Sequence, residues 1–142
     1  MIKFKAYSIT ILNCLMFPFL WSLHVAEFGA FPDDEKCDMN AINAALVAAK
    51  KNNKPVIYFD AGTYNLINTC IVPGKGYENY ITLHKLKNFT IEGATDKNGK
   101  PATRIERNLK LSNDTEAPHQ VDISYSKGIT LRNLILTNDP PL

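Results

Sequence analysis

The alternation of apolar and polar residues predicts short buried strands in the second half of the chain. Three segments share one order: a basic residue, Asn or Gly, alternating apolar and polar residues, and a turn former. They cover residues 87–93, 107–113 and 127–133 and are spaced by 20 residues. A fixed period of this size is typical of a solenoid, and the period of 2 within each segment predicts strands. We therefore expect a β-solenoid in which each segment packs on the next.

The same alternation predicts which side chains point into the solenoid. They are the apolar pairs Phe89 and Ile91, Leu109 and Leu111, and Ile129 and Leu131. Asn88, Asn108 and Gly128 share one position of the repeat, and Asn and Gly tolerate the left-handed backbone conformation. We expect a tight corner at this position.

A helical period precedes the strands. Apolar residues spaced i, i+3, i+4 and i+7 predict a helix over about residues 38–52 with one buried stripe, formed by Ile42, Ala45, Leu46 and Ala49. Asp38 is placed to cap the first turn of this helix, and the acidic loop before it is expected to serve the cap. Lys50 and Lys51 lie where they complement the dipole at its C-terminus.

The helix is followed by an apolar run that predicts a buried strand. Lys54-Pro55 ends the helix, residues 56–59 are rich in β-formers, and the turn at residues 60–63 stops them. A helix leading into a buried strand is what the start of a capped parallel sheet requires.

The segment from Phe28 to Tyr64 also carries a family register, kept by Gly29, Ala30, Asp33, Asp38, Ile42, Phe59, Gly62 and Tyr64. In this register the segment resembles the N-terminal portion of the pectin-lyase-like superfamily of secreted proteins. The resemblance implies an all-β fold, a right-handed parallel β-helix with an N-terminal capping α-helix and rungs from about residue 55. It also implies a carbohydrate-active protein, a glycoside hydrolase or polysaccharide lyase. No cofactor is expected, except calcium if the full-length protein is a lyase.

The first 26 residues have the pattern of a secretory signal. Lys3 and Lys5 precede an uncharged run from Ala6 to Leu23, and Ala26 offers a small residue for cleavage. An uncleaved membrane anchor is the alternative, because about 18 apolar residues can span a bilayer. With cleavage near Ala26, we expect residues 27–142 to form a domain that is secreted, periplasmic or at the cell surface, without a stable membrane span.

Removal of this segment makes the chain electrically neutral. Of the 16 basic and 14 acidic residues, the signal contains only Lys3 and Lys5, so 14 of each sign remain. Nucleic-acid binding depends on clustered Lys and Arg and has no support from this balance. The expected partner is a polysaccharide or oligosaccharide.

Cysteines and sequons fit export. Cys37 and Cys70 remain after cleavage, and they form either a disulfide or two buried free thiols. No Cys or His spacing typical of a metal site occurs. Two glycosylation sequons begin at Asn88 and Asn113.

A second strand in each repeat is predicted over residues 81–84 and 121–124, which are 40 residues and hence two 20-residue rungs apart. His84 and Asp122 would face outward on one sheet, where family enzymes bind their sugar chain. Two rungs separate these groups by about 10 Å, which is too far for a direct acid–base pair. A solvated sheet face is therefore the alternative interpretation.

Glycoside hydrolysis typically uses two carboxylates about 5 to 10 Å apart. The candidates on or beside strands are Glu92, Glu106, Asp122 and Asp139, and those in loops are Asp96, Asp114 and Glu116. Glu92 shares its repeat position with Ser112 and Arg132, so no second acid stacks on it. The sequence therefore predicts no catalytic pair, and the catalytic residues are unassigned.

No polar cap follows the last predicted strand, although repeat proteins normally cover such an edge. We therefore expect a truncated N-terminal fragment of a carbohydrate-active enzyme. A non-catalytic glycan-binding or adhesin-like surface protein and an inactive remnant are the alternatives.

Overall fold

The computed structural model describes residues 21–67, 81–108 and 120–139, which form parallel β-sheets and one α-helix. In chain order the elements are β1 (Ser22–His24), the 3₁₀ helix η1 (Val25–Phe28), α1 (Met39–Lys51), β2 (Val56–Phe59), β3 (Gly62–Leu66), β4 (Ile81–His84), β5 (Lys87–Gly93), β6 (Thr103–Asn108), β7 (Val121–Ser124), β8 (Lys127–Arg132) and β9 (Leu134–Asp139).

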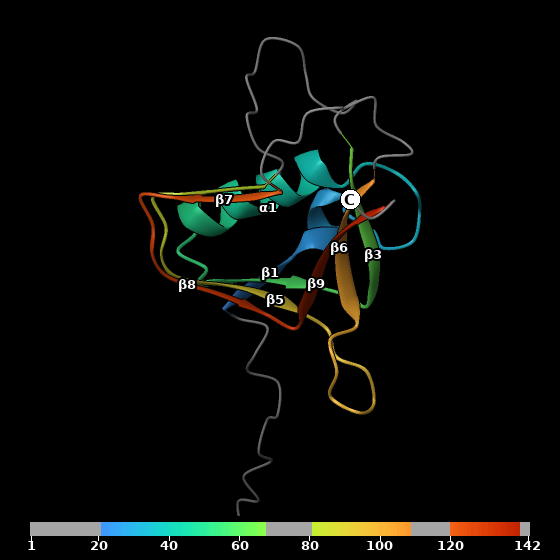
Figure 1. Cartoon of the computed structure of the whole chain (residues 1–142). Coiled ribbons are helices and arrows are strands. Elements are labelled where there is room, and N and C mark those ends of the chain that lie inside the picture. The colour runs from blue at the N-terminus through green and yellow to red at the C-terminus, as the bar shows by residue number, and fades with distance from the viewer. Residues whose placement is uncertain (1–20, 68–80, 109–119, 140–142) are drawn as a thin grey trace, which may run out of the picture.

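The strands form three sheets in which every neighbouring pair is parallel. Sheet A has the order β1-β2-β5-β8, sheet B has β3-β6-β9, and sheet C pairs β4 with β7. In Figure 1 sheet A lies at the bottom, sheet B at the right and sheet C at the top. The chain passes through C, A and B from β4 to β6, and again in this order from β7 to β9. Each strand of the second pass therefore lies beside its counterpart in the first.

The predicted 20-residue repeat is wrong as a stacking unit. Lys87 pairs with Lys127 and Ile81 with Val121, so one pass takes 40 residues in sheets A and C. Arg107 and Asn108, in the middle copy, end β6 in sheet B rather than stacking between β5 and β8. The interval of 20 residues is half of one 40-residue pass. The middle copy therefore begins on a different sheet, although its sequence resembles those of the other two copies. Leu109 and Leu111 lie outside the described residues.

The helix agrees with its prediction. α1 covers residues 39–51, and all four stripe residues, Ile42, Ala45, Leu46 and Ala49, are buried. The helix contacts η1, β1, β2 and β4, so its stripe packs on strands of sheets A and C. Lys50 and Lys51 occupy its last turn. The apolar period therefore identified both the helix and the face that it buries.

Asp38 occupies the N-cap position of α1, but its side chain makes no capping hydrogen bond. Its backbone is helical, with φ −94° and ψ −9°, whereas a capping residue is typically extended. The carboxylate instead accepts hydrogen bonds from the backbone N–H groups of Phe31 (3.2 Å, Oδ1) and Asn65 (2.8 Å, Oδ2). The prediction of a side-chain cap is thus wrong, and Asp38 joins the loop before α1 to β3.

Asp33 makes a second connection between this loop and β3. Its N–H donates to the Thr63 carbonyl and its Oδ1 accepts from the Thr63 N–H, both at 2.8 Å. Gly62 has φ +123°, and a Cβ there would overlap Asp33 and Pro32. Only glycine fits this corner, because it lacks the side chain that would displace the loop.

The corner predicted at the start of the repeat is present in sheet A. Asn88 and Gly128 both have left-handed backbones, with φ of 49° and 68°. Asn108 does not belong to this corner, because it lies in β6 and its Nδ2 donates to Asn65 Oδ1 at 3.1 Å.

Inward-pointing apolar residues form the core as the alternation predicts. Phe89 and Ile91 are buried, and Ile91 is 2% exposed. Leu131 holds the same position on β8 but is 38% exposed. The difference arises because β8 has a strand neighbour on only one side within the described part of the chain.

The folded part includes residues that precede the predicted cleavage site. β1 pairs with β2 through Ser22, Leu23 and His24, and Val25 is fully buried in the core. The signal peptide over residues 1–26 stays a prediction, but cleavage near Ala26 would remove this strand and this core side chain.

A chain that begins at Glu27 is therefore expected to be less stable than one that begins at Trp21. Loss of Val25 alone removes about 1.5 to 3 kcal/mol of burial free energy, and loss of β1 also exposes the edge of β2. Urea denaturation of both chains measures the difference. Equal unfolding midpoints would show that β1 and Val25 do not stabilise the fold.

Candidate functional site

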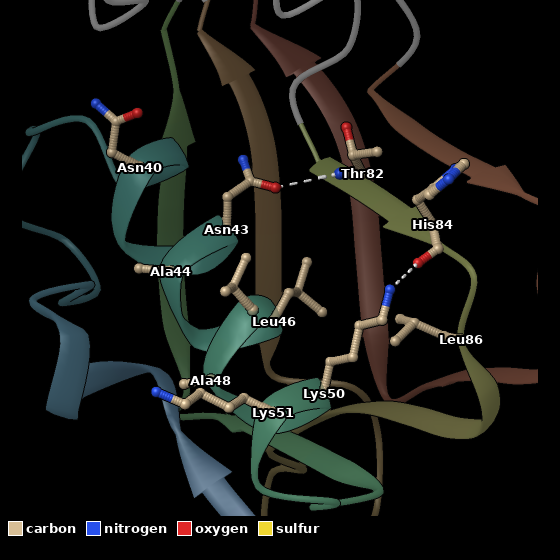
Figure 2. A pocket seen from close by; sticks show the side chains of 11 residues that line it. Asn40, Asn43, Ala44, Leu46, Ala48, Lys50, Lys51, Thr82, His84 and Leu86 are labelled. Carbon is tan, nitrogen blue, oxygen red and sulfur yellow. Dashed lines mark hydrogen bonds between the residues drawn. The ribbon is translucent and has the colours of Figure 1, made fainter.

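The described surface contains a groove between α1 and β4 (Figure 2). Its volume is about 780 Å³, and most of its lining comes from one side of the helix. The lining residues are Asn40, Asn43, Ala44, Leu46, Val47, Ala48, Lys50 and Lys51 from α1, and Thr82, His84 and Leu86 from β4 and the residues after it. The groove therefore combines an apolar floor with amide, ammonium, hydroxyl and imidazole groups at its sides.

Two hydrogen bonds hold the helix against β4 across this groove. Asn43 Oδ1 accepts from the Thr82 N–H at 3.2 Å, and Lys50 Nζ donates to the His84 carbonyl at 3.2 Å (Figure 2). Asn43 Nδ2 also donates to the Met39 carbonyl one turn earlier, which fixes the orientation of its amide. Both bonds satisfy backbone groups of β4, which joins the helix and sheet C into one wall.

His84 is at the outer end of the groove. It contacts Ser124, the last residue of β7, and Tyr125, which follows it. Its Nδ1 lies 3.0 Å from Ser124 Oγ, and its ring meets Tyr125 edge-on with 5.3 Å between the ring centres. Tyr125 is 86% exposed. An exposed aromatic ring, beside a histidine that contacts a serine hydroxyl, is thus presented on the outer side of sheet C.

The predicted separation of His84 and Asp122 by two rungs is wrong. β4 and β7 are direct neighbours, so His84 lies opposite Ser124 and Asp122 lies opposite Thr82. The error follows from the 20-residue period, which placed an additional strand between them. A hydrogen-bonded Ser–His pair is half of a nucleophilic constellation, which also needs a group that orients the histidine. Within the described ranges, no carboxylate bonds the other ring nitrogen of His84.

The carboxylates considered for catalysis are not brought together in the described part of the chain. Glu92 lies between Tyr58 and Arg132, and its Oε2 is 2.7 Å from Arg132 Nη2. Among the other strand acids, Glu106 lies between Asn65 and Thr137. Asp122 lies beside Thr82, and Asp139 lies beside Asn108. Each of these acids therefore faces non-acidic residues across the sheet.

The acids in loops have structural partners or lie outside the described residues. Asp96 is exposed, and its Oδ1 accepts from the N–H groups of Asn98 and Lys100 at 2.8 and 2.9 Å. These bonds stabilise the carboxylate and lower the pKa of Asp96. Asp114 and Glu116 lie outside the described residues.

A cluster on the outer face of sheet A was predicted from the sequence only in part. His24, Tyr58, Glu92 and Arg132 lie in one row across β1, β2, β5 and β8. His24 Nε2 is 3.1 Å from Asp60 Oδ1, and its ring centre is 5.4 Å from that of Tyr58. Burial, together with the charges of Asp60 and Glu92, raises the pKa of Tyr58. Pairing across strands brings these residues together. The repeat places Glu92 and Arg132 at one position, but the spacing of His24 and Tyr58 gives no signal that they join this row.

Both ring nitrogens of His24 are occupied in this cluster. Nδ1 accepts from the Ala26 N–H at 3.3 Å, so Nε2 carries the proton that faces Asp60. Glu27 in turn accepts from the His24 N–H, which completes a capping box at the start of η1. His24 therefore has a structural role at the start of the fold, and we do not assign it a catalytic one.

The remaining predicted site residues are only partly described. Cys37 is disulfide-bonded and its Sγ lies 3.6 Å from the Ile67 carbonyl, whereas Cys70 is outside the described residues, so the pairing of the two stays a prediction. Asn88 is exposed at its corner, and Asn113 is outside the described residues. Glycosylation of either stays a prediction.

The described residues contain neither a cluster of metal ligands nor a membrane-spanning helix. Within the described ranges, no three His, Cys, Asp or Glu side chains gather as a metal site would require. No helix in these ranges has the length and apolar character needed to cross a membrane.

Comparisons with known proteins do not assign the chain to a family. No protein-family model matches the chain, and no curated protein sequence matches it significantly.

Proposed function

We propose that the chain forms part of a right-handed parallel β-helix of the pectin-lyase-like type, with α1 as its N-terminal cap. The order in which the chain passes through three parallel sheets supports this proposal, since it is repeated from β4–β6 to β7–β9. The buried stripe of α1, which packs on strands of two sheets, supports the role of the helix as a cap.

We further propose that this protein is secreted and binds polysaccharide on the outer side of sheet C and in the adjoining groove. The observation that carries this proposal is the exposed ring of Tyr125, set against His84 and close to Ser124. Sugars are recognised by an aromatic surface combined with a few polar groups, and this face offers both. Tyr125 also has φ +52°, which is costly for a bulky residue that gains little burial. A binding role accounts for this combination better than packing does.

Glycoside hydrolase or polysaccharide lyase activity, which the family resemblance implies, is a prediction for the protein as a whole. Hydrolysis of glycosides typically needs two carboxylates around the sugar, and the strand acids discussed above each face non-acidic residues. Binding is therefore the function that we propose for the described residues. The disulfide-bonded Cys37 is compatible with an oxidising compartment and thus with export.

Replacing Tyr125 by alanine is expected to weaken polysaccharide binding about tenfold, which corresponds to about 1.4 kcal/mol for the loss of one aromatic contact. Isothermal titration calorimetry or affinity electrophoresis with a panel of neutral and acidic polysaccharides measures the effect. Phe31→Ala is the matched control, because Phe31 is an exposed aromatic residue in the loop before α1. Equal affinities of Tyr125→Ala and the wild-type protein, or no binding to any polysaccharide, would contradict the proposed function.

A further inference from the structure

A second hollow lies where the end of α1 meets the corner between β4 and β5. Its volume is about 270 Å³, and its lining consists of Ala49, Lys50, Asn53, Lys54, Pro55, Lys85, Lys87 and Phe89. Four of these residues are lysines and none is acidic. The hollow shares Lys50 with the groove of Figure 2, so the two lie on either side of this residue.

Two further lysines extend this positive region. Lys51 follows Lys50 in the last turn of α1, and Lys127 on β8 pairs in register with Lys87 on β5. We call these six residues, Lys50, Lys51, Lys54, Lys85, Lys87 and Lys127, the basic patch. All except Lys54 are exposed.

Carboxylates do not neutralise the exposed lysines of the patch in the described part of the chain. The ion pairs there join His24 to Asp60, Lys36 to Asp34, and Arg132 to Glu92. Lys50 uses its ammonium group to bond the His84 carbonyl, which leaves its charge without an acidic partner. The patch therefore concentrates positive charge on a chain whose residues 27–142 are formally neutral.

Folding requirements explain only part of this arrangement. The helix dipole favours Lys50 and Lys51 at the C-terminus of α1. Lys87 and Lys127, however, are like charges side by side on neighbouring strands, which destabilises a sheet. Lys85 has φ +56°, a conformation that Gly or Asn would adopt at lower cost. Two features of the patch thus oppose stability, so folding alone does not account for lysines at these positions.

We propose that the basic patch binds the carboxylate or sulfate groups of an anionic polysaccharide. This inference rests on the proposed polysaccharide-binding function and names the chemical class of its ligand. Lysine ammonium groups are compact hydrated charges that suit a flexible polyanion better than one rigid ligand. Because Lys50 lines both the hollow and the groove, one polysaccharide chain can contact the patch and the groove beside sheet C together.

The test reverses two charges of the patch with Lys87→Glu and Lys127→Glu in one protein. Both positions change sign, so the repulsion between neighbours is retained and the effect on folding is small. Lys97→Glu with Lys100→Glu is the matched control, because these exposed lysines lie in the loop between β5 and β6 and give the same change in net charge. The milder pair Lys87→Gln with Lys127→Gln serves if the reversed variant does not fold, as judged by circular dichroism.

Binding is measured for heparin (sulfates and carboxylates), polygalacturonate (carboxylates) and dextran (neutral) at several NaCl concentrations. We expect the wild-type protein to bind at least one polyanion, with affinity that falls as salt rises, and the patch variant to bind it about tenfold to a hundredfold more weakly. The control pair should change affinity less than about twofold beyond the effect of net charge. Binding of polygalacturonate would show that carboxylates suffice, whereas binding of heparin alone would show that sulfates are required.

Three results would overturn the inference. Equal losses in the patch and control variants would show that only net charge matters. Binding of dextran with no preference for either polyanion would refute the inference and leave the proposed function intact. Absence of binding to every polysaccharide would refute both.

Discussion

Wild-type protein is expected to lose stability as the pH rises from about 4 to about 7, and replacement of Asp38 by asparagine should abolish this loss. Burial raises the pKa of Asp38 from 3.8 to about 7, although hydrogen bonds from the backbone N–H groups of Asn65 and Phe31 oppose the shift. The folded protein therefore holds the proton more tightly than the unfolded chain. The resulting stabilisation is complete below about pH 4 and is lost as the pH rises through about 7.

The magnitude of this effect follows from linkage. A shift of about three pKa units corresponds to about 4 kcal/mol between the two ends of the pH range. Urea denaturation at intervals between about pH 4 and pH 8 gives the free energy of unfolding of the wild-type protein and of Asp38→Asn. A wild-type stability that stays constant or increases over this range would contradict the assignment, as would an equal slope in the variant.

Two further variants define the role of this side chain. Asp38→Ala removes the acceptor for one buried and one partly buried backbone N–H group, and at about pH 4 it should cost about 1 to 3 kcal/mol for the buried one. This cost should shrink as the pH rises, because the wild-type protein loses stability through Asp38 and the variant has no such group. Asp96→Asn is the control, because Asp96 is an exposed carboxylate whose pKa is lowered rather than raised. Its replacement should not remove the loss of stability between pH 4 and pH 7.

Local patterns in the sequence predicted the individual elements well. The helix, its buried stripe, and the strands β2, β4, β5 and β7 lie where the apolar periods placed them. These features depend on which face of one element is buried, and the period of apolar residues reports this directly. The αL corner at Asn88 and Gly128 was predictable for a similar reason, since few residues tolerate positive φ.

The pairing of strands could not be predicted in this way. Alternation gives the faces of a strand but does not indicate which sheet it joins. The segment 107–113 was therefore placed between β5 and β8, although its first two residues end β6, which pairs with β3 and β9. This one error separated His84 from Ser124, which are direct neighbours. The cluster of His24 and Asp60 was missed because 36 residues separate the two and no motif links them.

The role of Asp38 shows a different limit. An acid before an amphipathic helix typically caps it, and the sequence contains nothing against this assignment. Tertiary contacts decide otherwise, because the buried Asn65 N–H needs an acceptor and the carboxylate satisfies both this group and the partly buried Phe31 N–H. A functional interpretation of the acidic loop is unnecessary, since Asp33 and Asp38 both connect it to β3.

Replacement of Tyr64 by alanine is expected to destabilise the protein by about 3 to 5 kcal/mol, the range for removal of a large aromatic side chain from a core. Tyr64 is fully buried and meets Phe59 edge-on, with 5.1 Å between ring centres and an angle of 87°. Its hydroxyl oxygen also accepts from the Asp60 N–H at 3.1 Å, across the corner between β2 and β3. The ring thus supports both the first strands and the turn that joins them.

Tyr64→Phe separates the two contributions, because it keeps the ring and removes only the hydrogen-bond acceptor. Its expected cost is about 1 kcal/mol. Tyr125→Ala, at an exposed position, should leave the unfolding midpoint nearly unchanged and serves as the surface control. Urea denaturation of the three variants tests the ranking. If Tyr64→Ala were no more destabilising than Tyr125→Ala, the core around the β2–β3 corner would not be the part of the fold that stabilises it. If Tyr64→Phe matched Tyr64→Ala, the hydrogen bond to Asp60 rather than ring packing would hold this corner together.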